Sequence, residues 1–200
     1  MIIIGVDEVG RGCWAGPLVA GAVAFDMSGP VTEGLNDSKK LSKMARERLN
    51  PLIQKEALTT GLGWIEPGAI DISGITEAVK GAMYAAVQAV LAQLGEQSGE
   101  VEIIVDGSYD FLKDYQGLPP VRTMVGADGL VPAVSAASIL AKVARDDYMA
   151  TTAHAAFPAY GFDKHVGYGT AAHIAALNAH GVTDLHRKSY KPIQKFLQSI

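Results

Sequence analysis

The chain opens with an apolar run that leads directly into two adjacent carboxylates. Residues 2–7 read as a buried strand, and Asp7 and Glu8 fall at its carboxyl end. Adjacent acids on a buried strand repel each other and lose hydration, so they are unfavourable unless a cation lies beside them. In Gly10-Arg11-Gly12, which follows, the glycines let backbone approach a ligand beside a phosphate-binding guanidinium. This segment predicts metal-dependent chemistry on a phosphodiester.

Length and composition predict one globular domain. The 200 residues suffice for a single core over residues 1–200, and we expect a short helical part from about residue 170. The composition, 48% hydrophobic and 19% charged, excludes disorder, a collagen-like fold and a disulfide scaffold.

The sequence predicts a cytoplasmic, monomeric protein without membrane contact. It contains no run of about 18 apolar residues. No basic region precedes the first apolar run, as a signal peptide would require. The single cysteine, Cys13, cannot form an intrachain disulfide, which fits a reducing compartment. We expect Cys13 to be a small buried residue rather than a nucleophile.

The charge is unevenly distributed. The net charge of -4 argues against a general nucleic-acid coat protein. However, residues 39–48 hold five cations and one acid, and residues 186–195 hold four cations and no acid. These two segments could bind a polyanion at one place on the surface, or equally could be two solvated helix faces.

The hydrophobic pattern predicts an α/β domain with a mixed central sheet. We expect Asp37-Ser38 to cap the first helix and Pro132 to open a later one. The expected strands cover residues 2–7, 18–25, 59–65, 101–105 and 121–125, and the expected helices cover 41–56, 74–95, 132–150 and 170–179.

Two further acids repeat the pattern of Asp7. Asp106 ends the apolar strand 101–105, and Asp128 lies in a glycine-flanked segment before a helix. Ligands of open α/β sheets gather at the carboxyl ends of strands, so these acids can meet in one cleft if the two strands are neighbours. Carboxylates suit Mg²⁺ or Mn²⁺, and two such ions can activate a water and stabilise a leaving oxygen.

The structural alternative for each acid is a turn former or cap. Strand alternation adds a geometric condition, because successive side chains point to opposite faces. Asp7 and Glu8 can share a metal only if the strand ends or twists between them, which the following glycines favour. The same glycines do not form a dinucleotide-binding loop, because a strand-like run rather than a helix follows them.

Several motifs in order along the chain resemble type 2 ribonucleases H, the ribonuclease HII family. The resemblance covers almost the whole chain. It rests on Asp7–Gly12 with Ala15-Gly16-Pro17, Leu35–Ser42, Ile104–Gly107, Asp128 with Pro132–Asp146, Tyr160-Gly161-Phe162, His165–Thr170 and His186–Tyr190.

The resemblance implies an RNase H-like fold with helices flanking a mixed central β-sheet, plus C-terminal helices. It implies hydrolysis of RNA in RNA–DNA hybrids and cleavage 5′ to single ribonucleotides embedded in duplex DNA. Products would carry a 5′-phosphate and a 3′-hydroxyl, and two Mg²⁺ or Mn²⁺ ions would act in the complex. The catalytic, metal-binding residues would be Asp7, Glu8, Asp106 and Asp128.

The resemblance also assigns substrate contacts. Gly10-Arg11-Gly12 takes the place of the motif that reads the RNA–DNA junction. Tyr168 matches the tyrosine that stacks on the sugar and helps to sense the 2′-hydroxyl, although a loop anchor is the structural alternative. Phosphate contacts are expected at Lys39, Lys142 and Arg187.

Other interpretations stay open at this point. Residues 70–75 and 108–112 depart from the family pattern, which bears on loop geometry and substrate preference. His165 and His186 fit either a role beside phosphate or carboxylate or a hydrogen-bonded structural role. The rival functions are another two-metal nuclease on the same fold and a non-catalytic module that binds hybrids. The acids speak against the second, because pure binding favours neutral or basic residues near phosphate. Replication or repair partners are not predicted.

Overall fold

The computed structural model describes residues 1–29, 31–95 and 100–198. The chain divides into two compact units. The first, called the sheet unit, consists of Met1–Val9, Val19–Trp64 and Val79–Val143. The second, called the helical unit, consists of Gly10–Leu18, Ile65–Ala78 and Ala144–Ile200.

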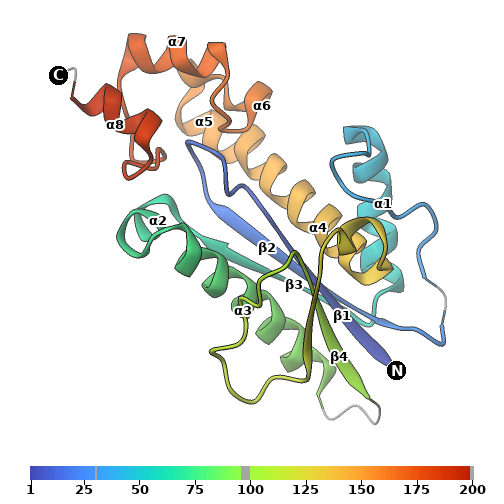
Figure 1. Ribbon diagram of the computed structural model, residues 1–200. Helices are drawn as coiled ribbons and strands as arrows, with labels where there is room; N and C mark the ends of the chain where they lie inside the picture. The colour runs from blue at the N-terminus through green and yellow to red at the C-terminus, as the bar shows by residue number, and fades with distance from the viewer. Residues whose placement is uncertain (30, 96–99, 199–200) are drawn as a thin grey trace. The chain divides into compact units, whose positions relative to one another are not determined.

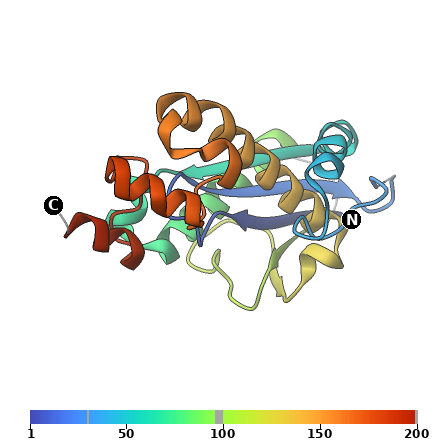
Figure 2. The same cartoon turned by 90° about the horizontal axis from the view of Figure 1, so that it is seen from above.

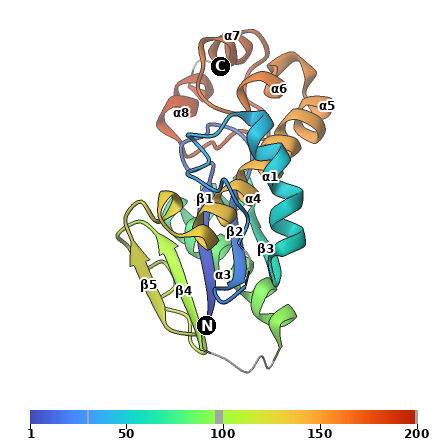
Figure 3. The same cartoon turned by 90° about the vertical axis from the view of Figure 1, so that its right-hand side faces the viewer.

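A mixed sheet of five strands forms within the described chain (Figure 1), in the order β3-β2-β1-β4-β5, which can be followed in Figure 3. β1 pairs antiparallel with β2 and parallel with β4, and β4 pairs parallel with β5. The predicted mixed sheet is therefore confirmed. The strands are β1 (Ile2–Val9), β2 (Leu18–Asp26), β3 (Thr59–Ile65), β4 (Val101–Asp106) and β5 (Val121–Met124).

Helices pack on the sheet at glycines, where two backbones come close together. A Cβ on Gly5 or Gly21 would overlap backbone atoms of α4 (Pro132–Tyr148), which lies alongside the strands in Figures 1 and 2. A Cβ on Gly63 would likewise overlap α3 (Ile75–Leu94). Leu62, the neighbour of Gly63, instead joins the core formed with α1 (Lys43–Glu56) and α4. By strand alternation, α3 and α4 therefore cover opposite faces.

Short helices make up most of the helical unit (Figure 3). They are α2 (Pro67–Ser73), α5 (His154–Ala156), α6 (Phe162–His165), α7 (Ala171–His180) and α8 (Lys191–Leu197). A 3₁₀ turn, Ala127–Gly129, belongs to the sheet unit; in the helical unit, a π-helical turn, Met149–Ala153, precedes α5, and a second 3₁₀ turn spans Pro158–Tyr160. Arg145 lies fully buried here and donates to the carbonyl oxygens of Pro17, Ala15 and Val166 at 2.8, 3.0 and 2.9 Å. This arginine therefore ties two separate backbone segments, residues 15–17 and Val166, to its own helix.

The predicted strands and long helices are confirmed with small shifts of their ends. The predicted cap of the first helix is wrong, because α1 begins at Lys43 and Ser42 is its N-cap. Asp37 instead accepts from the amide of Lys39 at 2.9 Å, and Ser38 bonds to Ser138 at 2.7 Å. The helix predicted to end near 150 passes into the π-helical turn after Tyr148. α2, which has proline in its first turn, was not predicted, whereas α8 falls within the helical part predicted from about residue 170.

No helix in the described residues has the combination of length and apolar character needed to cross a membrane.

Candidate active site

The carboxylates of the sheet unit gather at the carboxyl edge of two parallel strands. β1 and β4 stay in register to the pair Val6 and Val105, so the next residues, Asp7 and Asp106, are neighbours. The turn after β5 returns to the same edge, where the amide of Asp128 donates to Asp106 Oδ1 at 3.4 Å. The expected condition, that the strands carrying Asp7 and Asp106 are neighbours, is met, although β1 runs on past Asp7 to Val9.

Asp7 is the most perturbed acid of this edge. Its side chain is only 5% exposed and accepts hydrogen bonds from the Glu8 amide, at 2.8 Å, and from Ser138. Burial, then the charges of Glu8 and Asp106, raises its pKa to about 8, although the two hydrogen bonds oppose the rise. A nearby divalent cation would remove this penalty, because it favours the charged form.

The pKa of Asp128 is also raised. Its pKa is raised by burial, then by the charges of Asp106 and Asp37, whereas Lys39 opposes the rise. The Lys39 Nζ lies 3.9 Å from Asp128 Oδ2. Hard oxygen donors crowded until they repel one another fit Mg²⁺ or Mn²⁺.

Glu8 occupies a different position from the one expected. β1 does not end or turn between the two acids, since the pairing with β2 runs on to Val9 and Val19. The pleat therefore directs the Glu8 side chain to the face opposite Asp7. Among the described residues, no group of three or more Asp, Glu, His or Cys side chains is arranged to hold a metal ion. The acids form a repelling edge rather than a closed cage.

Two lysines predicted to contact phosphate belong to the sheet unit. Lys39 has its ammonium beside Asp128, as described. Lys142 follows Ser138 by one helical turn of α4, so the two side chains leave the helix on the same side. The hydroxyl of Ser138 contacts Asp7, which places that side of α4 toward the carboxylate edge.

The glycine-arginine-glycine segment belongs to the helical unit, and its two glycines differ. Gly10 has φ +94°, and a Cβ there would lie 2.5 Å from Arg145 Nε, so the fold requires glycine. Gly12 has no left-handed φ, and a Cβ there would meet no atom within 4 Å. The fold therefore does not require glycine at position 12.

Arg187 corrects a prediction. Its side chain is fully buried and donates to the carbonyl oxygen of Gly16 at 3.1 and 2.9 Å and to that of Arg11 at 3.1 Å. Tyr190 donates to the same Arg11 carbonyl at 2.6 Å. A guanidinium without exposed surface cannot contact a phosphate. Arg187 instead holds the backbone of the segment that carries Arg11.

Tyr168 lies in a loop packed against the residues that follow this segment. Gly167 accepts from the amide of Trp14 at 2.8 Å, and a Cβ on Gly169 would overlap the Trp14 ring. The phenol is 39% exposed and hydrogen-bonds Cys13, which is buried as predicted. Burial, then Cys13, raises the pKa of Tyr168 to about 12, so the hydroxyl stays protonated.

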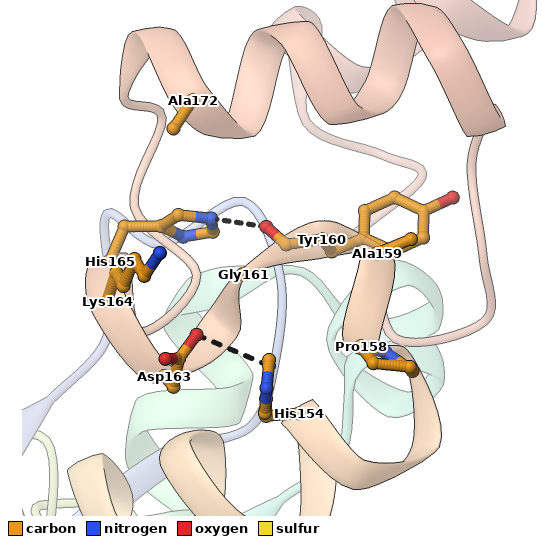
Figure 4. A pocket seen from close by; sticks show the side chains of 9 residues that line it. All are labelled: His154, Pro158, Ala159, Tyr160, Gly161, Asp163, Lys164, His165 and Ala172. Atoms are coloured by element: carbon orange, nitrogen blue, oxygen red, sulfur yellow. Dashed lines mark hydrogen bonds and ion pairs between the residues drawn. The ribbon is translucent and has the colours of Figure 1, made fainter.

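His165 has a structural role in this unit. Its Nε2 donates to the Tyr160 carbonyl at 2.8 Å, and its Nδ1 accepts from Gly167 at 3.3 Å. It lines a pocket of about 390 Å³ together with the His154–Asp163 pair, whose Nδ1 and Oδ1 lie 3.3 Å apart (Figure 4). With both ring nitrogens engaged by backbone, the structural alternative for His165 is favoured.

Sequence reasoning missed several side chains that hold the site. Ser138 and Arg145 lie in the predicted helix opened by Pro132, but neither carries a local signal, because their partners are distant in sequence. Asp37 was expected to cap a helix and instead hydrogen-bonds Asp128.

Comparisons with known proteins agree with the resemblance in the sequence. The profile of the family described as Ribonuclease HII matches residues 4–193. A ribonuclease HII of Hyphomonas neptunium is 44% identical over 202 residues, covering 98% of this chain and 97% of that protein. A ribonuclease HII of Azoarcus sp. (strain BH72) is 42% identical over 198 residues, covering 99% and 91%.

Solved structures share the fold. The ribonuclease H2 from Pyrococcus horikoshii OT3 aligns with a TM-score of 0.79 at 24% identity, covering 100% of this chain and 98% of that one. Bst-RNase HIII in complex with Mn²⁺ aligns with a TM-score of 0.76 at 20% identity, covering 100% and 70%. The PCNA:RNase HII complex from Archaeoglobus fulgidus gives a TM-score of 0.72 at 25% identity and full coverage of both chains.

Proposed function

Since this chain belongs to the ribonuclease HII family and is a metal-dependent endoribonuclease acting on RNA–DNA hybrids, we propose that it also cleaves duplex DNA 5′ to single embedded ribonucleotides. We propose four acids as its catalytic metal ligands: Asp7, Glu8, Asp106 and Asp128. The observation that carries this assignment is the pairing of Asp7 and Asp106 on adjacent parallel strands, with Asp7 buried and its pKa raised to about 8.

The metal would be Mg²⁺ or Mn²⁺, and we propose two ions in the active complex. When bound, such ions supply charge that activates a water and stabilises the leaving oxygen of an in-line displacement. Asp7, two residues before the end of β1, and Asp106, at the end of β4, would hold the metal. Asp128 would add a carboxylate from the turn after β5. Glu8 would complete the set only with a change of its side-chain direction relative to the strand pleat.

Recognition of the ribonucleotide would rest on the helical unit. Gly12 leaves room for the sugar to approach backbone, and the cation of Arg11 lies beside it in sequence. Tyr168 would place its protonated hydroxyl where it senses the 2′-hydroxyl, the group that separates RNA from DNA. Lys39 and Lys142 would contact phosphates of the substrate.

We also propose that residues 1–200 act as one catalytic domain and as a monomer in the cytoplasm. The family match over residues 4–193 supports a single functional domain that includes both compact units. The free, buried thiol of Cys13 fits a reducing compartment.

The test uses a labelled DNA duplex with one ribonucleotide, a matched all-DNA duplex and a uniform RNA–DNA hybrid, each with Mg²⁺ or Mn²⁺. We expect incision 5′ to the ribonucleotide, with a 5′-phosphate on the downstream product and no cut in the all-DNA duplex. Cleavage of the hybrid alone would restrict the enzyme to long RNA tracts. Binding of all substrates without any incision would indicate the rival function, a hybrid-binding module.

A further inference from the structure

Among the described residues, three histidines are buried, and all belong to the helical unit. His165, His173 and His186 are 7%, 0% and 1% exposed. The rings of His165 and His173 stack with centroids 4.5 Å apart, and His173 Nε2 lies 3.0 Å from His186 Nε2. Buried imidazoles need partners for both ring nitrogens, and these partners decide which nitrogen carries hydrogen.

The direction of each hydrogen bond through His173 and His186 is forced. His173 Nδ1 lies 3.0 Å from the Tyr168 carbonyl oxygen, which can only accept, so this nitrogen carries the hydrogen. At the other end, the amide of Thr183 donates to His186 Nδ1 at 3.0 Å, so that nitrogen has none. His186 must then donate from Nε2 to His173 Nε2. Both rings are neutral, and a chain of hydrogen bonds runs from the Thr183 amide through His186 and His173 to the Tyr168 carbonyl.

This chain of hydrogen bonds ends on the backbone of the loop that presents Tyr168. The Tyr168 carbonyl accepts from His173 and also from the amide of Thr170 at 2.8 Å. The Tyr168 amide donates to the carbonyl of His165 at 2.9 Å. On the other side, Trp14 packs against Gly169. The backbone of Tyr168 is thus held at both its donor and its acceptor.

We propose that His173 and His186 are positioning residues for Tyr168 that fix the angle at which its phenol meets the ribose. This inference rests on the proposed role of Tyr168 in sensing the 2′-hydroxyl. Tyr168 is 39% exposed, so its side chain can meet a substrate, and its phenol hydrogen-bonds Cys13. A loop that must hold one exposed ring needs its backbone fixed, because small displacements of a substrate contact weaken catalysis strongly.

The experiment compares two replacements of His173. In His173→Asn, the amide nitrogen lies close to the former Nδ1 and can still donate to the Tyr168 carbonyl, whereas His173→Leu fills the space without a donor. His180→Asn is the matched control, because this exposed histidine lies on the same helix α7. The substrate is a duplex with one ribonucleotide, and kcat, KM and thermal unfolding are measured for each variant.

We expect kcat of His173→Leu to fall by about 10- to 100-fold with little change in KM, and His173→Asn to retain most activity. His180→Asn should match the wild type. In a Tyr168→Ala background, His173→Leu should cause no further loss, because the histidine acts through the tyrosine. If His173→Leu does not fold, Thr183→Val is used in its place. This substitution removes only the hydroxyl 2.8 Å from His186 Nδ1, so it should cause a smaller fall in kcat.

Three results would overturn the inference, and they differ in what else they affect. If Tyr168→Ala is impaired but every His173 and Thr183 variant is fully active, the positioning role alone is wrong. If His173→Leu causes the same loss with and without Tyr168, the histidine serves general structure. If Tyr168→Ala itself is fully active, the proposed function of Tyr168 fails, and the inference fails with it.

Discussion

Ser138 and Asp7, which lie on α4 and β1, are joined by a hydrogen bond from the serine hydroxyl to the buried carboxylate. The same hydroxyl contacts Ser38 Oγ at 2.7 Å, and Ser38 directly precedes Lys39. The hydrogen bond lowers the pKa of Asp7 against the effect of burial, so it favours the charged form that a metal requires. Ser138 therefore links the proposed central metal ligand to the segment that carries a proposed phosphate contact.

Ser138→Ala should weaken the metal site without disturbing the fold. The loss of one hydrogen bond to a charged group is worth about 1.5 kcal/mol, which corresponds to a roughly tenfold higher metal requirement. We expect the Mg²⁺ concentration for half-maximal cleavage to rise while activity recovers at high Mg²⁺. Ser73→Ala, which removes an exposed hydroxyl bonded to its own helix, is the control. An unchanged Mg²⁺ dependence would show that Ser138 does not act on the metal site.

Asp7→Asn should separate catalysis from stability. The substitution removes a metal ligand, so cleavage should fall by at least about 10³-fold, whereas binding of the hybrid should stay equal or improve because a negative charge is lost. The metal-free protein should also melt a few degrees higher, roughly 2–4 °C per kcal/mol, since a buried repelling carboxylate has been replaced. Cleavage assays, hybrid binding and calorimetry without metal check these outcomes. Asp184→Asn, which changes a carboxylate that is 97% exposed, should leave all three unchanged.

A cleaving Asp7→Asn enzyme would remove Asp7 from the proposed metal site. A lower melting temperature in the metal-free variant would instead show that the Ser138 and Glu8 hydrogen bonds outweigh the burial penalty.

Gly12→Ala should impair cleavage and leave the fold intact. A Cβ at this position would meet no atom of the protein within 4 Å, so the unfolding free energy should change by less than about 0.5 kcal/mol. If the ribose approaches this backbone as proposed, the methyl group should lower kcat/KM by about tenfold or more. Gly10→Ala is the contrasting variant, because its φ of +94° and contact with Arg145 predict a loss of stability. A fully active Gly12→Ala enzyme would mean that no substrate group approaches this backbone.

The sequence was sufficient to predict the carboxylate edge because its signals are local. An apolar run followed by an acid reports a strand and its end within a few residues, and this held for Asp7 in β1 and Asp106 in β4. The mixture of strand and helix patterns predicted the mixed sheet but not the order of its strands, which only the structure shows. The same kind of reading recovered β3 at Thr59–Ile65 without any shift.

The remaining features depend on partners far along the chain. Ser38 looked like a helix cap, but its hydroxyl bonds to Ser138 from another element. Arg187 looked like a phosphate contact because charge alone does not reveal burial, and its guanidinium holds carbonyl oxygens instead. The direction of the Glu8 side chain followed from pairing with β2 through Val9, which the neighbouring glycines did not predict.

The paired histidines should make the fold sensitive to acid. Burial lowers the pKa of both His173 and His186 to about 4, and for His186 the charge of His173 contributes as well. The unfolded chain takes up these protons near pH 6.5, so the stability they contribute is complete above that pH and is lost as the pH falls toward 4. The stability advantage of the wild type over His173→Asn should therefore shrink by on the order of 2 kcal/mol between pH 7 and pH 4. Asp7, whose raised pKa changes stability with pH in the opposite direction, is present in both proteins. Its contribution therefore cancels when the stability of the variant is subtracted from that of the wild type. Urea unfolding at several pH values measures this difference, with His180→Asn as the control, and a difference independent of pH would show that His173 is not held neutral in the native state.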